Sequence, residues 1–155
     1  MKKLFCIFCF CAILAPPAQA AVVKRQIFFG TGLVAPFEGT KAVSTIGGIA
    51  AILPISSRVF LRPLVGAGAN WPLNGGSAVP LLQAGTLLGF KANAHVSLLV
   101  GGAMIASFPA DKPVAIVPTA LFSSAIRLTP HWGIFTPIAV NKKAAGLQVQ
   151  VGYTW

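Results

Sequence analysis

The sequence predicts an all-β protein that crosses a membrane as an eight-stranded antiparallel barrel, an up-and-down meander with short loops. Three observations predict this fold. The chain begins with an export signal. Only 9% of its residues are charged, whereas about 25% is usual for soluble domains. Residues 146–155 alternate strictly between apolar and small or polar side chains, which is the period of a β-strand.

The export signal occupies residues 1–20. It combines Lys2 and Lys3, an apolar run over 4–14, and the small residues Ala18 and Ala20 on either side of Gln19. We therefore expect a cleaved signal peptide at 1–20 and one barrel domain at 21–155. All three cysteines lie within the first segment, so the domain is expected to have no disulfide and no cysteine-based site.

The charge of the domain is basic. Removal of Lys2 and Lys3 leaves ten of the twelve Lys and Arg residues, with Glu38 and Asp111 as the two acids. A basic chain can bind nucleic acid. Here the cations are scattered singly along an exported, apolar chain, which favours membrane lipid phosphates as partners and argues against nucleic acid.

The last segment has the clearest strand pattern. Leu147, Val149, Val151, Tyr153 and Trp155 fall on one face of a strand, opposite Gly, Gln and Thr. This ending resembles the C-terminal assembly signal of bacterial outer-membrane barrels, which is carried here by Val149, Val151, Tyr153 and Trp155. The resemblance implies an outer-membrane location and recognition by the outer-membrane assembly machinery. The alternative is an ordinary final strand of a periplasmic β-sandwich.

Turn residues divide the remaining chain into segments that suit membrane strands of about 9 to 11 residues. Pro36 to Thr40 forms the first break, and a long polar stretch over 69–77 forms the longest. The strands are expected at 23–35, 41–54, 58–68, 78–90, 95–107, 114–127, 132–140 and 145–155.

Small barrels of this class usually have both termini in the periplasm, which would place the 69–77 loop outside. In architecture the chain resembles the OmpA transmembrane domain and the opacity proteins, a likeness of class and not of motif. The resemblance implies a monomeric, non-enzymatic protein with a role in envelope structure, lipid interaction or surface contact.

The alternation also predicts which residues face the lumen. In the fifth strand Ser97, Gly101 and Ala103 share the inner face, and in the sixth Thr119 and Ser123 do. An eight-stranded barrel is just wide enough to be filled by side chains. We therefore expect a packed interior of Gly, Ala, Ser, Thr and Gln. The second strand shows no clean alternation, and its faces stay unassigned.

One charge lies within a strand. Arg62 shares its phase with Phe60 and Leu64, which places it in the lumen, away from hydrocarbon. No acid is expected in any strand, so Gln83, Gln148, Gln150 and water are the expected partners. A structural contact is favoured over a functional role.

The other cations fall near strand ends. Arg25, Arg58, Lys91 and Arg127 are expected at the inner side, and Lys41, Lys112, Lys142 and Lys143 at the outer side. The outer lysines are candidate contacts for lipopolysaccharide phosphates. Solvated loop charge is the alternative.

No catalytic set is found. His95 and His131 fall at expected inner turns, whereas Glu38 and Asp111 fall in outer loops, so a histidine, a nucleophile and an acid do not converge. The sequence gives no metal or cofactor motif. A lipid A-modifying or other lipid-acting enzyme and a narrow pore for small solutes remain alternative functions.

Prolines are the main difficulty for the barrel. Pro63, Pro80, Pro118 and Pro137 lie within or near expected strands, where bulges would be one way to accommodate them. The competing fold is a bundle of short membrane helices, with candidates at 42–57 and 92–110. Charged residues divide the chain into windows mostly shorter than the ~20 residues that a spanning helix needs, which favours the barrel.

Overall fold

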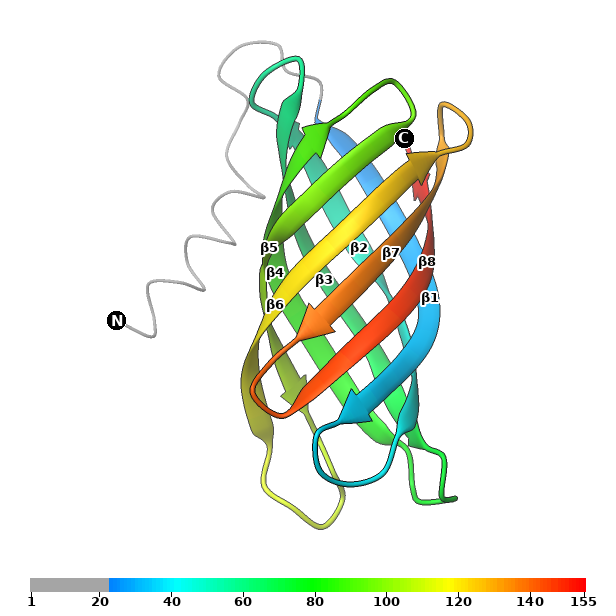
Figure 1. Ribbon diagram of the computed structural model, residues 1–155, viewed down its shortest axis with the longest axis vertical. Helices are drawn as coiled ribbons and strands as arrows, with labels where there is room; N and C mark the ends of the chain where they lie inside the picture. The colour runs from blue at the N-terminus through cyan, green and yellow to red at the C-terminus, as the bar shows by residue number, and fades with distance from the viewer. Residues whose placement is uncertain (1–22) are drawn as a thin grey trace, which may run out of the picture.

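Eight antiparallel strands pair in sequence order, and the last strand pairs with the first, so that the sheet closes on itself (Figure 1). The computed structural model describes residues 23–155. The predicted signal peptide at 1–20 lies outside this range. The strands are β1 (Lys24–Pro36), β2 (Ala42–Pro54), β3 (Val59–Pro72), β4 (Val79–Lys91), β5 (Val96–Ser107), β6 (Ala115–Arg127), β7 (Trp132–Val140) and β8 (Ala144–Thr154).

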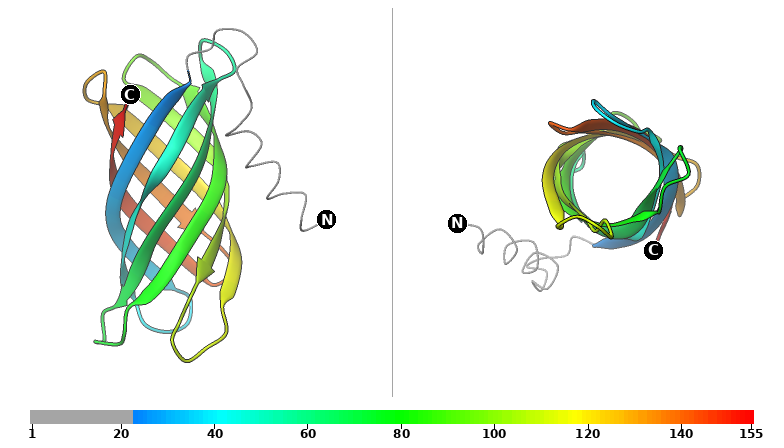
Figure 2. Two further views of the ribbon diagram at one scale, coloured as in Figure 1. Left: turned by 180° about the vertical axis from the view of Figure 1, so that it is seen from behind. Right: turned by 90° about the horizontal axis from the view of Figure 1, so that it is seen from below.

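Closure rests on a continuous ladder between β1 and β8, which runs from Gln26↔Thr154 to Pro36↔Ala144. Seen along its long axis, the chain forms a complete ring (Figure 2). The predicted eight-stranded meander is therefore confirmed, and the helical alternative is wrong. Within residues 23–155, no helix has the length and apolar character needed to cross a membrane.

The boundaries differ from the prediction mainly in β3. This strand was expected to end at residue 68, yet it continues to Pro72, with Trp71 opposite Val43 in β2. The Asn-Trp-Pro sequence has the composition of a turn. Pairing with the start of β2 holds it in the sheet, and the connection to β4 is correspondingly shorter than 69–77.

Burial alternates along the strands as the sequence of β5 and β6 predicts. In β5, Leu99 and Ala103 are buried in the lumen, while Leu98 and Val100 lie exposed on the outer wall. The structure also assigns β2, whose even-numbered residues face inward; Ala42, Ser44, Ile46 and Ala50 are buried. The glycines and alanines on both faces of β2 explain why its sequence showed no clear period.

The interior is more apolar than predicted. An apolar cluster contributed by β1 to β6 packs within the lumen, so the expected interior of small and mildly polar residues is only part of what is found; Thr119, Ser123 and Gln150 are buried there as expected, beside large apolar side chains. The buried members of the cluster are Phe28, Ala50, Phe60, Leu64, Leu87, Leu99, Ala103 and Leu121.

Glycines explain how aromatic rings fit inside so narrow a barrel. The ring of Phe60 occupies the space above Gly89, where a Cβ would overlap it. A Cβ on Gly48 would lie 2.7 Å from Cζ of Phe28, and one on Gly152 would lie 2.8 Å from Cε2 of Phe135. Each lumen ring therefore takes the space that a side chain on a neighbouring strand would otherwise fill.

Two strand prolines coincide with interruptions of the ladders. Pro63 lies where the β2–β3 pairing skips from Ala50↔Leu64 to Leu53↔Leu61. Pro137 lies in the corresponding gap of β7–β8, between Phe135↔Gln150 and Ile138↔Leu147. The register is the same on both sides of each gap, so no residue is inserted. At Pro63 and Pro137 the missing N–H groups are therefore accommodated by unpaired positions on one side of the strand and not by bulges.

Replacing Gly89 by alanine should destabilise the barrel. The added methyl group must displace the Phe60 ring within the lumen cluster, and such overpacking typically costs about 1 to 3 kcal/mol. Urea unfolding of the protein in lipid vesicles would measure the change. Gly102→Ala is the matched control, because that Cβ would lie on the outer wall, 3.5 Å from the carbonyl oxygen of Thr119. Equal stability of the two variants would contradict the proposed packing.

Candidate functional site

The most distinctive polar group in the barrel is Arg62, which β3 directs into the lumen and which is only 3% exposed. Its Nε and Nη2 atoms donate hydrogen bonds to Oε1 of Gln26, at 3.0 and 2.8 Å. Gln26 in turn donates from Nε2 to Oγ1 of Thr154, at 3.0 Å. A chain of hydrogen bonds thus crosses the lumen from β3 to β1 and on to β8.

Two aromatic rings complete the surroundings of Arg62. The guanidinium carbon lies 5.3 Å from the ring centroid of Phe28 and 4.7 Å from that of Phe135. Both distances are within the range of cation–π attraction, which is stronger where water is excluded. The positive charge is therefore held by an amide oxygen and two ring faces, without an acid.

The partners of Arg62 differ from those predicted. Gln26 accepts its hydrogen bonds, whereas Gln150 and Gln148 form a separate chain. In that chain Gln150 Nε2 donates to Gln148 Oε1 at 3.0 Å, and Gln148 Nε2 donates to Ser44 Oγ at 3.1 Å. Gln83 faces the lumen from β4 but belongs to neither chain.

Sequence reasoning missed Gln26, Phe28 and Phe135. The period of β1 could have placed Gln26 and Phe28 on one face, because they are two residues apart. Which strands meet across the lumen depends on their stagger, and the sequence pattern does not report the stagger. The contact between β1 and β3 was therefore not accessible from periodicity alone.

Arg62 lies at the floor of a cavity of about 780 Å³. The β2–β3, β4–β5 and β6–β7 turns lie at one end of the barrel (Figure 1). The cavity lies at that end, because residues of all three turns line it, together with Lys24 of β1 and Thr154 of β8. We call it the terminal cavity. Apolar residues near its floor are Phe60, Phe135 and Ile52, and the charged or titratable residues that line it are Lys24, Arg62, Lys91, His95, Arg127 and His131.

Turn backbone holds several side chains at the rim of the terminal cavity. Arg127 donates from Nε to the carbonyl oxygen of Thr129 at 3.2 Å. Nδ1 of His131 lies 2.9 Å from the carbonyl oxygen of Thr154. Because a carbonyl only accepts, Nδ1 is the donor in this contact, and Nε2 of that ring stays available for a second partner.

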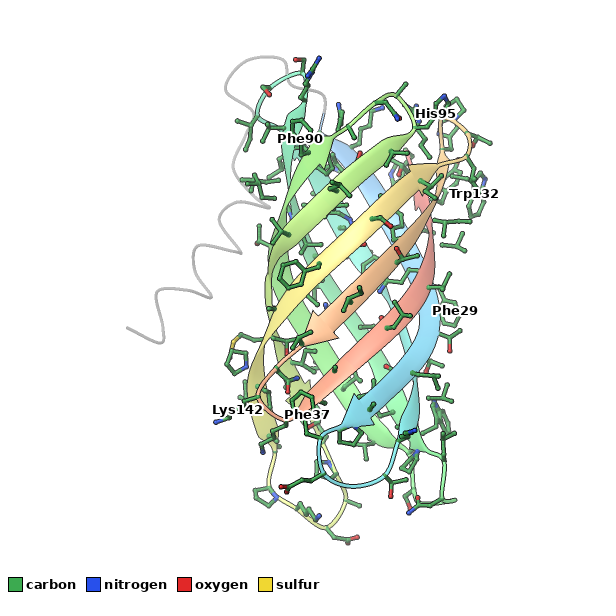
Figure 3. The ribbon with its side chains drawn as sticks, viewed as in Figure 1. Phe29, Phe37, Phe90, His95, Trp132 and Lys142 are labelled. Carbon is green, nitrogen blue, oxygen red and sulfur yellow. The ribbon has the colours of Figure 1, made fainter. Side chains whose placement is uncertain are left out.

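The opposite end carries the other group of predicted cations. Lys41, Lys112, Lys142 and Lys143 are all exposed, in or beside the loops that connect β1–β2, β5–β6 and β7–β8. Figure 3 shows Lys142 and Phe37 at this end, far from His95. Glu38 and Asp111 lie in loops at the same end.

Tyr153 and Trp155 of the C-terminal segment form an aromatic cluster with Trp132 of β7, at the end of the barrel that holds the terminal cavity. The ring centroid of Tyr153 lies 5.0 Å from that of Trp132 and 6.3 Å from that of Trp155. Val149 and Val151 are exposed on the outer wall in the same phase. This arrangement suits an aromatic belt at a membrane interface. Recognition of these residues by assembly machinery stays a prediction.

No catalytic constellation is assembled among residues 23–155. His95 and His131 lie in turns at the terminal end, and the two acids lie in loops at the other end of the barrel. In the same part of the chain, no group of three His, Cys, Asp or Glu residues is placed to hold a metal ion.

No protein-family model and no curated protein sequence matches the chain. Among solved structures it is similar to the N-terminal barrel domain of Pseudomonas aeruginosa OprF, with a TM-score of 0.62 and 9% identity over 85% of this chain and 97% of that one. Ail of Yersinia pestis gives 0.58 and 10% over 86% and 97%. Neisserial surface protein A gives 0.54 and 12% over 85% and 95%.

One further structure of Ail contains the heparin analogue sucrose octasulfate. At these levels of identity the likeness concerns the fold. The chain therefore has the fold of small outer-membrane β-barrels, as its sequence predicted.

Replacing Gln26 by leucine should destabilise the protein by about 1 to 3 kcal/mol, because the buried guanidinium loses its hydrogen-bond acceptor. Gln83→Leu is the matched control, since it makes the same change at a lumen position that takes no part in the hydrogen bonds linking Arg62, Gln26 and Thr154. We expect that control to change the free energy of unfolding by no more than about 0.5 kcal/mol. Chemical unfolding in lipid vesicles measures both.

The double variant Gln26→Leu with Arg62→Met removes both partners and should be more stable than Gln26→Leu alone. Additive losses in this double-mutant cycle would show that Arg62 and Gln26 do not interact as described.

Proposed function

We propose that this chain is an integral outer-membrane barrel with a non-enzymatic role in the envelope, in which its outer-loop lysines contact the phosphates of lipopolysaccharide. The observation that carries this proposal is the apolar outer wall. Large hydrophobic side chains lie exposed along most strands, among them Phe29 (65% exposed), Ile116 (62%) and Leu33 (59%).

Such a wall has no suitable partner in water. Soluble monomers rarely expose continuous apolar surfaces of this kind, whereas a membrane barrel needs a tall apolar band between two interfaces. Aromatic residues near both ends of the wall support this embedding, with Trp132 and Phe90 towards one end and Phe37 towards the other (Figure 3). Lipid is therefore the solvent that the outer surface fits.

The four exposed lysines suit contact with lipopolysaccharide. If the termini lie in the periplasm, as in related architectures, the loops with Lys41, Lys112, Lys142 and Lys143 lie in the outer leaflet region, where lipid A phosphates are found. Long lysine side chains reach such phosphates from the edge of an apolar wall. Ail, whose fold is similar, has been solved in complex with the heparin analogue sucrose octasulfate, and this observation on Ail supports a test of polyanion binding here.

The lumen supports this role over that of a pore. The cluster formed by Phe60, Leu87, Leu121 and their neighbours packs across the interior. The separation of His95 and His131 from Glu38 and Asp111 likewise supports a non-enzymatic role over a lipid-acting enzyme, because a histidine cannot be oriented by an acid at the other end of the barrel.

Neutralising the loop lysines should weaken binding to lipopolysaccharide. We expect a loss of about 1 kcal/mol for each lysine replaced by glutamine at low salt, since basic groups near an anionic lipid surface contribute about this much. Binding of purified protein to immobilised lipopolysaccharide, with sucrose octasulfate as soluble competitor, provides the measurement. The variant replaces Lys41, Lys112, Lys142 and Lys143.

The matched control replaces four cations at the terminal end and should bind normally. Its positions are Lys24, Arg25, Arg58 and Lys91. An equal loss in both variants would indicate attraction by overall charge and would contradict a specific loop contact.

The packed lumen leads to a second expectation. Reconstituted in planar lipid bilayers, the protein should produce no steady ohmic channels, because large apolar side chains block the path of hydrated ions. Bilayers that receive detergent alone provide the baseline. Reproducible single-channel steps that scale with salt concentration would favour the pore instead.

A further inference from the structure

We propose that the terminal cavity binds a small organic anion. In this inference Arg62 at the floor binds a phosphate or carboxylate group, and the apolar part of the ligand lies against Phe60 and Phe135. The inference does not depend on the role of the outer lysines, because the cavity and those lysines occupy opposite ends of the barrel.

The first argument is the unfinished hydrogen bonding of Arg62. Among residues 23–155 only Gln26 accepts from this guanidinium, through Nε and Nη2, so Nη1 and a second hydrogen on Nη2 have no acceptor within that range. The side chain is 3% exposed, yet it is among the residues that line the cavity. A ligand in the cavity can therefore reach the guanidinium, which is already held in place by its amide partner and two rings.

The second argument is the lack of a counter-charge. Glu38 and Asp111 are the only acidic side chains in the whole sequence, and both lie in loops at the far end of the barrel. A buried charge is costly unless it is paired. Gln26 and the rings of Phe28 and Phe135 reduce this cost but do not neutralise the charge. An anion in the cavity would neutralise it and form charge-assisted hydrogen bonds with the guanidinium.

The third argument is the charge and shape of the entrance. Lys24, Lys91 and Arg127 line the cavity together with Arg62, so every charged side chain in the lining is positive. A cleft lined by one sign of charge raises the local concentration of oppositely charged ligands. The volume of about 780 Å³ is within the range of roughly 300 to 1,000 Å³ that is usual for small-molecule sites. Apolar walls beside the guanidinium favour an organic anion over a bare ion.

The binding test uses the protein in lipid nanodiscs, in which both ends of the barrel are accessible. Four probes separate the contributions to binding: butyl phosphate and butyrate carry both a charge and an apolar body, inorganic phosphate carries only the charge, and butanol carries only the body. We expect saturable binding of butyl phosphate or butyrate in calorimetry, weaker binding of phosphate, and none of butanol. Equal binding of butanol, or no binding of either organic anion, would overturn the proposal.

Variants locate the site. Arg62→Met should weaken binding of the organic anion by at least about tenfold, because it removes the charged donors at the floor. Arg58→Met is the matched control; it removes an arginine at the same end that does not line the cavity, and it should leave affinity within about twofold. Equal affinity of the two variants would assign binding to general surface charge and overturn the role of Arg62.

A measurement on the unaltered protein keeps the proposal testable if Arg62→Met does not fold. The Nε–H group of Arg62 is buried and hydrogen-bonded, so its NMR signal should be distinguishable from those of exposed arginines. Saturating butyl phosphate should shift this signal with the same dissociation constant as calorimetry gives. Shifts confined to the signals of Arg25, Arg58 and Arg127 would place the anion at the rim and refute the floor site.

Discussion

Within hydrocarbon every backbone N–H and C=O group needs a partner in the protein, and the fold of this chain depends on that constraint. The ladder between β1 and β8 removes the last free edge of the sheet. A proline within a strand conflicts with this constraint because it has no N–H group to donate to the carbonyl oxygen on the neighbouring strand. Pro63 and Pro137 are tolerated where the ladders already skip two positions without losing register. Bulges would have changed the inward and outward sets of residues on either side, whereas these gaps preserve them.

Constant register has a direct effect on the lumen. Because each strand keeps one phase, inward positions stay inward over its whole length, and glycines on one strand can be matched to rings on another. Phe60 above Gly89 and Phe135 beside Gly152 are both matched in this way. The same matching encloses the guanidinium of Arg62 between Phe28 and Phe135. The position of the polar site and that of the apolar cluster therefore both depend on the constant register of the strands.

The sequence predicted the number of strands, their order and most of their bounds, because alternation and turn residues are local signals. It also placed Arg62 on the inward phase. It did not predict the apolar interior or the contact with Gln26, since both depend on which strands meet across the lumen. The end of β3 was missed for a related reason: Trp71 and Pro72 have turn composition, and only pairing with β2 keeps them extended. Local patterns thus sufficed for the wall, and the stagger of the strands determined the interior.

The order of the strands has a consequence for how the chain folds. Seven of the eight ladders join strands that are neighbours in sequence, and only β1–β8 joins the two ends of the domain. The largest entropic cost of loop closure therefore falls on the pairing of β1 with β8, whereas the other ladders join strands that are close in sequence. The bond between Gln26 and Thr154 spans this seam. We expect the guanidinium of Arg62 to stay hydrated in the open sheet and to lose its water only when the two ends meet, so that desolvation of a single charge contributes to the barrier of the final step.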